Sequence, residues 1–245
     1  MSTKNLLIEA IKDQQNIFGD DLYENLNFSN QIKNNFLNDN SVKEKPEFYM
    51  PPKSLFENYS EYKTLESFNK KINTCQKCPL GKTRTKFVFG AGNPNADVMV
   101  IGEAPGADED AQGVPFVGRA GKLLTDILKA IDFDREEVFI ANILKCRPPN
   151  NRNPLPEEMN ECTPYLYKQI ELVKPKVILL VGLISASTLL NTKLSLTKMR
   201  GNVYEIQGIK TMVTYHPAAL LRNPNWKRGC WEDVQKFKKL YESLK

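Results

Sequence analysis

Four of the five cysteines have the spacing of metal ligands. Cys75 and Cys78 form a C-x2-C pair, and Cys146 and Cys162 follow as two distant single residues. Such a set can surround a tetrahedral zinc ion or an iron–sulfur cluster, and the number of thiolates does not decide between them. Pro79 and the Arg-Pro-Pro after Cys146 stiffen the adjoining loops, which favours a ligand set over unrelated buried thiols.

Two polar residues lie in or directly after apolar segments. Asn142 interrupts the apolar run 138–144, and His216, the only histidine, follows the run 210–215. A buried amide must find hydrogen-bond partners, and near the end of a strand that partner can be a ligand. Both are therefore candidate ligand-contacting residues, with a satisfied structural group as the alternative. Phe116, in a Pro-Phe-Val-Gly loop, is by itself predicted to be a core residue.

An acidic loop follows the apolar segment 97–102. Its sequence, GEAPG, begins at Gly102 and matches neither a Walker motif nor a dinucleotide-binding fingerprint. Four acidic residues lie in or just after it, namely Glu103, Asp108, Glu109 and Asp110. An acidic cluster in a loop is more often solvated surface than a catalytic group, so this cluster alone indicates only a candidate site.

The segment 220–228, LLRNPNWKR, combines apolar side chains with three cations. An apolar wedge can unstack a DNA base step while flanking Lys and Arg neutralise phosphates. The alternative is a loop at the start of a helix with solvated charges.

The elements that must position these residues follow an α/β pattern. Buried strands are expected at 97–102, 138–144, 176–182 and 210–215, with an extra edge strand at 203–206. Helices are expected between and after them, at 121–131, 156–173, 185–191 and 231–244. Alternating strands and helices predict a parallel sheet covered on both faces, with the ligand site at the carboxyl ends of the strands. The three unusual loops all follow predicted strands, so we expect them at that edge.

The composition argues against a membrane protein and is compatible with a protein that binds nucleic acid. Hydrophobic residues make up 41% of the 245, the mean hydropathy is −0.45, and no apolar run approaches the roughly 20 residues of a membrane span. No export signal is present, so the cysteines are not expected to form disulfides, and a cytoplasmic, nucleoid-associated location is expected. Residues 66–245 carry a net charge of +8 and residues 1–65 a net charge of −3. The basic part permits a nucleic-acid partner without requiring one.

Residues 1–65 are predicted to be a loosely folded extension and linker that precedes a single domain, 66–245. The extension is rich in asparagine and has only two short amphipathic patterns, which bury too little surface to stand alone. Ser54-Leu55-Phe56 partly resembles a bacterial sliding-clamp-binding peptide, although the usual leading glutamine is missing. An ordinary linker that docks an aromatic residue is the favoured alternative.

Taken together, five stretches resemble the family 4 uracil-DNA glycosylases, the iron–sulfur branch of that superfamily. They are CQKCPLGKTR, GEAPGADED, GVPFVGRAGKLL, FIANILKCRPPNNRNP and HPAALLRNP, in the family's order. The resemblance covers residues 66–245. It implies a three-layer α/β/α sandwich with a central four-stranded, mainly parallel sheet. It also implies a structural [4Fe–4S] cluster held by the four cysteines.

The resemblance further implies a monofunctional enzyme that rotates uracil out of DNA, hydrolyses its glycosidic bond and so begins base excision repair. Phe116 would stack on the uracil ring, Asn142 would read its edge, and His216 would donate a hydrogen bond to O2. Leu220 would fill the space left in the DNA, with Arg222 among the basic residues holding the strand.

The resemblance does not identify the acidic residue that orients the attacking water. The family 1 enzymes carry aspartate where this chain has Ala104, within a base-binding loop that begins at Gly102. Glu103 and Glu109 are therefore the candidates for water positioning or cation stabilisation. Asn151 is predicted to support the base-binding residues or to contact DNA.

Two other functions stay open at this point. A non-catalytic iron–sulfur module would bind DNA with an affinity insensitive to changes at Asn142 or His216. A nucleotide-binding protein whose four cysteines bind a structural zinc ion would lack the brown colour of an iron–sulfur cluster. No repeat or dimerisation heptad occurs, so a monomer is expected.

Overall fold

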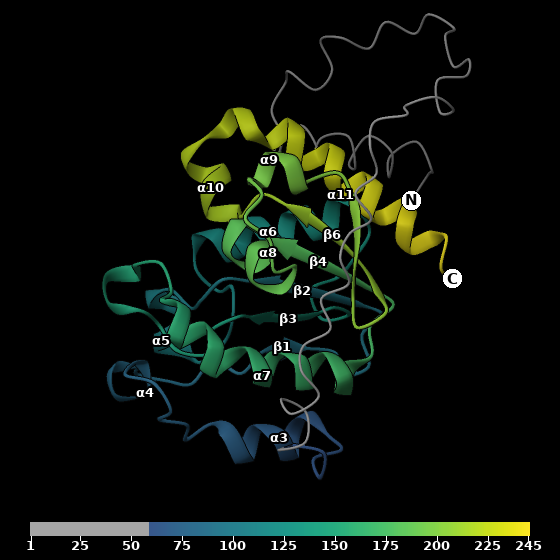
Figure 1. The fold of residues 1–245 in the computed structure, drawn as a ribbon. Helices are drawn as coiled ribbons and strands as arrows, with labels where there is room; N and C mark the ends of the chain where they lie inside the picture. The colour runs from purple at the N-terminus through teal and green to yellow at the C-terminus, as the bar shows by residue number, and fades with distance from the viewer. Residues whose placement is uncertain (1–58) are drawn as a thin grey trace, which may run out of the picture.

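The computed structural model describes residues 59–245, which build a six-stranded sheet between helices (Figure 1). The strand order is β1-β3-β2-β4-β6-β5. The bounds are β1 Ala91–Gly92, β2 Val98–Gly102, β3 Phe139–Asn142, β4 Val177–Val181, β5 Val203–Ile206 and β6 Ile209–Thr214. The central four strands are parallel, and β1 and β5 pair antiparallel at the two edges.

The four predicted buried strands and the edge strand 203–206 are confirmed, whereas β1 was not expected. β1 is only two residues long, too short to show a period in the sequence. A Cβ atom on Gly92 would lie 1.8 Å from the Val138 carbonyl oxygen, so the close pairing of β1 with β3 requires glycine there.

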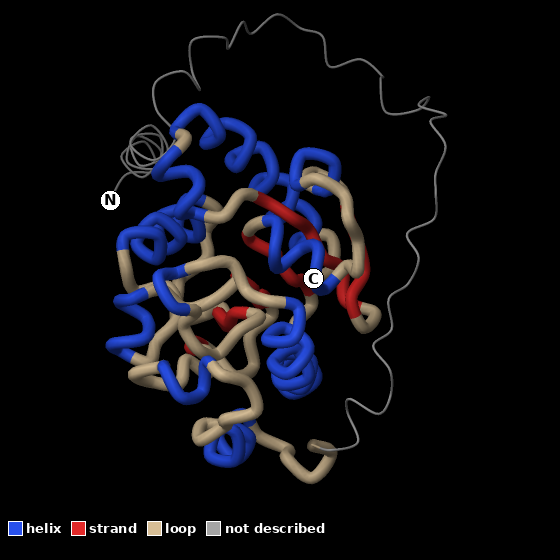
Figure 2. Tube along the Cα trace, turned by 60° about the vertical axis from the view of Figure 1, so that its left-hand side comes forward, coloured by secondary structure: helices blue, strands red, loops and turns tan. Residues whose placement is uncertain are grey.

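Helices lie on both faces of the sheet (Figures 1 and 2). The described α-helices are α3 Leu65–Ile72, α4 Leu80–Thr83, α5 Ala107–Gln112, α6 Arg119–Ala130, α7 Pro156–Val173, α8 Leu183–Leu189, α9 Leu196–Met199, α10 Pro217–Arg222 and α11 Lys227–Glu242, with 3-10 turns η2 Pro149–Asn151 and η3 Pro224–Trp226. The four predicted helices correspond to α6, α7, α8 and α11. The other described α-helices, which have four to eight residues, were not predicted, because about two turns or fewer carry little periodicity.

Alternate residues of the strands enter two separate cores. Met99 and Ile101 of β2 pack with α3, α7, α8 and α9, whereas Val98 and Val100 pack with α6, α10 and α11. β4 divides in the same way, and all five of its residues are buried. Two apolar faces explain why these strands are continuous hydrophobic runs, and they make the fold the predicted three-layer sandwich.

Tyr59, the first residue that the structure describes, already packs against this domain. Tyr59 is buried, with its ring 5.4 Å from that of Phe68 and 5.5 Å from that of Tyr165. The boundary between residues 65 and 66 therefore stays a prediction. The expected loose extension, its two short helices and the Ser54-Leu55-Phe56 peptide lie outside the described residues.

Within residues 59–245, no helix is both long enough and apolar enough to cross a membrane.

Replacing Phe68 by alanine is expected to lower the free energy of unfolding by about 3 kcal/mol, because this fully buried ring leaves a cavity among aromatic side chains. Urea unfolding followed by circular dichroism measures the change. Tyr62→Ala, at a half-buried ring of the same cluster, is the matched control and should cost less than half as much. Equal small losses in both variants would show that α3 is not part of the cooperative unit.

Candidate active site

Residues from the ends of β2 and β3 and from two loops meet at the carboxyl edge of the sheet. Gly102 ends β2 and pairs with Asn142 at the end of β3. A Cβ atom on Gly102 would lie 2.5 Å from both Asn142 Oδ1 and Phe116 Cζ, so these two atoms are at most 5 Å apart. The Phe116 ring lies 5.6 Å from the His216 ring. We call Gly102, Phe116, Asn142 and His216 the strand-end site, and the structure brings these four predicted residues together.

Phe116 is held in an unusual backbone conformation. Its φ angle is 53°, in the left-handed region that is costly for a residue with a bulky side chain. A Cβ atom on Gly121 would lie 1.9 Å from the Phe116 carbonyl oxygen, so the first turn of α6 can support this loop only with glycine there. The ring itself is 6% exposed. Such strain, held by close packing, is typical of a residue positioned for a ligand.

Asn142 carries the most informative polar atom of the site. The residue is 2% exposed, and its Oδ1 has no hydrogen-bond partner among the described residues. An unsatisfied buried acceptor costs about 1–3 kcal/mol, and a bound ligand with an N–H group would remove that cost. Among the described residues, Asn142 Oδ1 is therefore the buried acceptor of the strand-end site that is available to a bound molecule.

His216 is positioned as a neutral hydrogen-bond donor. It caps the N-terminus of α10, where its Nδ1 accepts from the Ala218 N–H at 3.2 Å. Burial, together with the charge of Arg222, lowers the pKa of His216 to about 4. At neutral pH the ring is therefore uncharged. Because Nδ1 accepts a hydrogen bond, the remaining proton lies on Nε2.

The two candidate acids have different environments. Burial raises the pKa of Glu103, which directly follows β2. The carboxylate of Glu109 instead accepts three backbone N–H groups, from Gly106 at 3.0 Å, Val117 at 2.9 Å and Gly118 at 3.0 Å. Glu109 therefore joins the acidic loop to the Phe116 loop, and its oxygens are committed to that structural role.

The two other predicted base-binding residues, Ala104 and Asn151, lie in loops that follow β2 and β3. Ala104 is half-buried in the loop after β2. Asn151 is exposed in η2, and its Oδ1 accepts from Arg147 Nε at 2.8 Å. Because Asn151 is exposed and its Oδ1 already accepts from Arg147, a DNA contact fits better of its two predicted roles.

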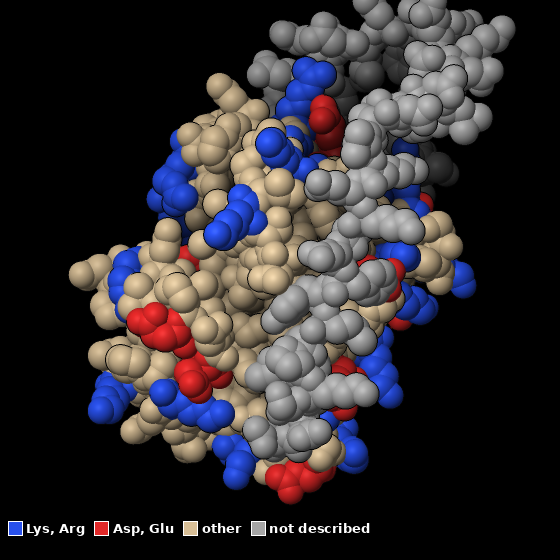
Figure 3. Space-filling model, viewed as in Figure 1, with Lys and Arg blue, Asp and Glu red and all other residues tan. Residues whose placement is uncertain are grey.

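Leu220, which is predicted to enter the DNA, lies inside the protein in this structure. Leu220 is completely buried in the core beneath α10, whereas the next residue, Leu221, is 40% exposed. α10 begins at Pro217, and its helical phase turns position 220 inward and position 221 outward. Arg222 is exposed, as a DNA contact requires. Lys and Arg side chains gather at the edge where α10 lies (Figure 3).

Hydrogen-bond donors surround the predicted metal-ligating thiols. Arg84 Nη1 lies 3.2 Å from Cys146 Sγ, and the Tyr165 hydroxyl lies 3.2 Å from Cys75 Sγ. The Lys145 N–H lies 3.4 Å from Cys162 Sγ. Thiolates that ligate a cluster carry negative charge and accept such bonds, so this donor set fits an iron–sulfur cluster.

Zinc is the alternative to a cluster for the same four cysteines. In the described part of the chain, no group of three Cys, His, Asp or Glu side chains is arranged to hold one ion. Tetrahedral zinc bonds its thiolates at about 2.3 Å and so draws them close together, whereas the four irons of a cluster hold its thiolates further apart.

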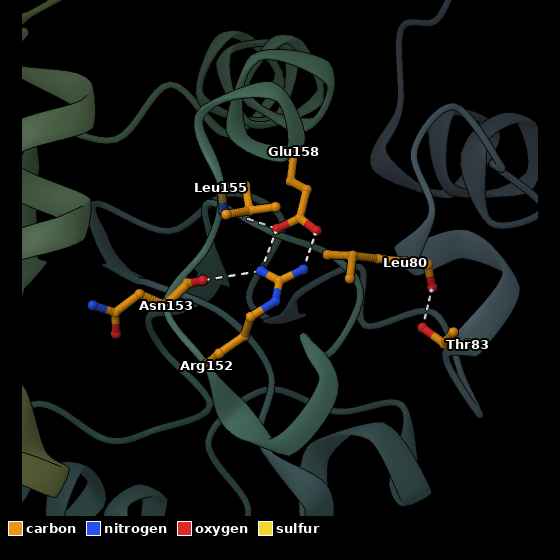
Figure 4. Close-up of polar contacts among 6 residues, drawn as sticks. All are labelled: Leu80, Thr83, Arg152, Asn153, Leu155 and Glu158. Carbon is orange, nitrogen blue, oxygen red and sulfur yellow. Dashed lines mark hydrogen bonds and ion pairs between the residues drawn. The ribbon is translucent and has the colours of Figure 1, made fainter.

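An ion pair fixes the loop that follows Cys146 to the helix that carries Cys162. Arg152 donates to both carboxylate oxygens of Glu158, at 2.6 and 2.9 Å, and the Leu155 N–H donates to the same carboxylate (Figure 4). Glu158 is 1% exposed, and Arg152 lowers its pKa. The carboxylate thus holds the NRNP segment against the start of α7, which favours a fixed distance between the two cysteines.

Lys145 was not singled out from the sequence, yet it lies between the strand-end site and the cysteines. Its side chain is fully buried and donates to the Asn142 carbonyl oxygen at 2.8 Å and to Gln169 Oε1 at 2.6 Å. Burial lowers its pKa to about 7. A lysine directly after the apolar run 138–144 was the available signal, because buried lysines are rare unless paired.

A family model described as the uracil DNA glycosylase superfamily matches residues 89–244. This range contains the whole strand-end site, together with Cys146 and Cys162.

Several relatives named type-4 uracil-DNA glycosylase resemble most of the chain. A type-4 uracil-DNA glycosylase of Archaeoglobus fulgidus is 43% identical over 72% of this chain and 93% of its own length. The type-4 uracil-DNA glycosylase of Saccharolobus solfataricus is 48% identical over 70% of this chain and 84% of its own. That of Thermotoga maritima is 42% identical over 74% of this chain and 96% of its own.

The protonation state of His216 can be tested directly, because the chain has one histidine. We expect 15N-histidine NMR of tag-free protein to show, at pH 7, a neutral ring protonated on Nε2 that titrates near pH 4. The folded pKa lies below the usual 6.5, so this residue stabilises the fold above pH 6.5, and that contribution is lost as the pH falls toward 4. A ring that titrates near 6.5, or is protonated on Nδ1, would contradict the assignment.

Proposed function

The chain belongs to the uracil-DNA glycosylase superfamily, and we propose that it rotates uracil out of DNA and hydrolyses the bond between uracil and deoxyribose. It is an enzyme of the type-4 group, with which it shares 42–48% identity. Asn142 is the single observation that carries the residue assignments. Its buried, unpartnered Oδ1 lies beside an aromatic ring that itself contacts an imidazole.

The same arrangement explains the choice of base. Uracil presents an N3–H donor and an O4 acceptor, and Asn142 can accept from the first with Oδ1 and donate to the second with Nδ2. Cytosine presents the reverse pattern, so a fixed amide in this orientation would leave both groups unpaired. Phe116 would stack on the ring, while Gly102 leaves the base free of a Cβ atom at the end of β2.

Bond cleavage leaves electrons on the departing base, and His216 is suited to stabilise that charge. Its Nε2–H would donate to uracil O2, with the strongest interaction when the negative charge has developed. Water then attacks the sugar cation. Glu103 is the better candidate for positioning that water, because the oxygens of Glu109 already accept three backbone N–H groups.

DNA would contact the face that carries α10 and the loop after it. We assign Leu221, rather than Leu220, to the space that the extruded base leaves, since it is the exposed apolar side chain of α10. Arg222 would neutralise phosphate beside it. A non-catalytic DNA-binding module is disfavoured, because binding alone gives no reason for an unpaired buried amide beside a neutral histidine.

A [4Fe–4S] cluster bound by Cys75, Cys78, Cys146 and Cys162 is part of the proposal. When bound, the cluster would serve as a structural link rather than a reactant. The residues around it hold the loop after β3 in place: Arg84 bonds to the thiol of Cys146 and to the carbonyl of Cys75, so it spans two of the ligand segments.

Uracil-containing DNA is the proposed partner, and the protein is proposed to act where that DNA is, in the cytoplasm at the nucleoid. The monomeric state and the contact with a sliding clamp stay predictions.

The base-reading role of Asn142 predicts a change of specificity. Asn142→Asp is expected to lower uracil release by at least a hundredfold and to improve the relative activity on cytosine, because a carboxylate can accept from the cytosine amine. A labelled strand with one uracil or one cytosine, cleaved by alkali after reaction, measures both. Asn95→Asp, exposed before β2 at the opposite edge of the sheet, is the control and should retain full activity. Unchanged uracil release by Asn142→Asp would remove this residue from the site.

The role of His216 predicts a loss in turnover rather than in binding. His216→Ala should lower kcat by about a hundredfold to a thousandfold, as does the loss of one donor to a developing oxyanion, with KM changed by less than threefold. Single-turnover kinetics on the uracil strand give both values. A rise in KM that accounts for the whole loss would contradict the role.

The cluster assignment predicts that protein purified without oxygen is brown and contains iron and sulfide but no stoichiometric zinc. Metal analysis and the visible absorption spectrum test this. Cys146→Ser should lose iron and lower thermal stability, whereas Cys230→Ser, at a buried cysteine outside the set, should keep its iron. Zinc in place of iron in the wild-type protein would overturn the assignment.

A further inference from the structure

Trp226 is an exposed aromatic side chain that stacks on Tyr215, the residue before His216. It lies in η3 and is 42% exposed. Among the large hydrophobic residues that are exposed in the described part of the chain, it is the only aromatic one. Neither the proposed base recognition nor the proposed chemistry uses it.

The indole ring is held in one orientation from below. It stacks on Tyr215, with ring centroids 5.1 Å apart and planes inclined by 20°. Tyr215 in turn contacts the guanidinium group of Arg200, whose carbon lies 4.5 Å from the ring centroid. Arg200 is fixed by Asp233 at 2.8 Å and by the Gly229 carbonyl. A tryptophan that is covered on one side and still 42% exposed presents its other side to solvent.

The Trp226–Tyr215 stack lies on the part of the chain that is proposed to contact DNA. Tyr215 directly precedes His216, and α10 packs against η3. Arg222 precedes Trp226, and Lys227 and Arg228 follow it, so cations flank the ring on both sides along the chain. Figure 3 shows Lys and Arg side chains at the edge that α10 occupies in Figure 1.

We propose that Trp226 is a stacking platform for an unpaired nucleobase close to the extruded uracil, on the same strand. The proposal rests on the proposed function and adds a second base-binding position to it. A fixed aromatic face with flanking cations is how proteins bind single-stranded DNA: the ring stacks on a base and the cations neutralise the backbone. In a duplex both faces of each base are already covered by its neighbours. Trp226 therefore favours uracil in single-stranded DNA.

Kinetics on single strands test the platform. Trp226→Ala is expected to raise KM for a uracil-containing single strand about tenfold, the size of one base–aromatic stack, with kcat changed by less than twofold. On the same sequence as a duplex the rise should be less than threefold. Trp226→Phe keeps an aromatic face and should recover most of the single-strand KM. Equal KM values for wild type and Trp226→Ala on the single strand would overturn the proposal.

A nucleotide scan locates the stacked base. Each of the three nucleotides on either side of the uracil is replaced in turn by an abasic spacer. At one position the spacer should raise the wild-type KM about tenfold and leave that of Trp226→Ala unchanged. The variant already lacks the base–indole contact, so removing the base has no further effect. Spacer effects that are the same in both proteins at every position would show that Trp226 stacks on no base.

Fluorescence tests stacking independently of catalysis. The chain has two tryptophans, and the second, Trp231, is buried. In a Trp231→Phe background, a uracil-free single strand should quench the emission of Trp226 at the concentration at which labelled DNA binds by anisotropy. The Trp226→Phe protein, which retains Trp231, should bind with little quenching. Binding without quenching of Trp226 would refute the platform, and inactive wild-type protein that still shows the quenching would refute only the glycosylase.

Discussion

The carboxylate of Glu109 provides the interaction on which the strand-end site depends. By accepting N–H groups from Gly106, Val117 and Gly118, it joins the loop after β2 to the loop that carries Phe116. That second loop holds Phe116 at a positive φ, which an isolated loop would not keep. The ends of strands β3 and β6 position Asn142 and His216, and this does not depend on the two loops. The aromatic ring reaches them because one half-buried carboxylate, that of Glu109, holds the two loops together.

Much of this arrangement follows from sequence because parallel strands end at a common edge. Long apolar runs identified the four central strands, since each strand is buried on both faces and needs no polar alternation. With the strands placed in this way, Asn142 and His216 are expected at the same edge, although 73 residues separate them in the chain. The role of Phe116 came from the resemblance to a family, because a phenylalanine in a loop carries no such signal by itself.

The features that sequence did not predict depend on three-dimensional packing. β1 exists because Gly92 allows a close approach to β3, not because of any periodic pattern. The outward side chain of α10 is Leu221 rather than Leu220, and that choice is set by where the helix begins. In the sequence, nothing distinguishes Glu109 from the neighbouring acidic residues. Only the folded loops show which backbone N–H groups donate to its carboxylate. Lys145 gains its partners across the fold, from Gln169 of α7.

The order of elements along the chain has a consequence for biosynthesis. All four candidate metal ligands precede β4, whereas His216 follows β6, the last strand. A chain emerging from the ribosome therefore presents its thiols before the central strand β2 can pair with β4, and presents its imidazole later still. Pairing between such distant segments is slow to form. A translation product that stops before β6 would contain all four candidate metal ligands but would lack His216.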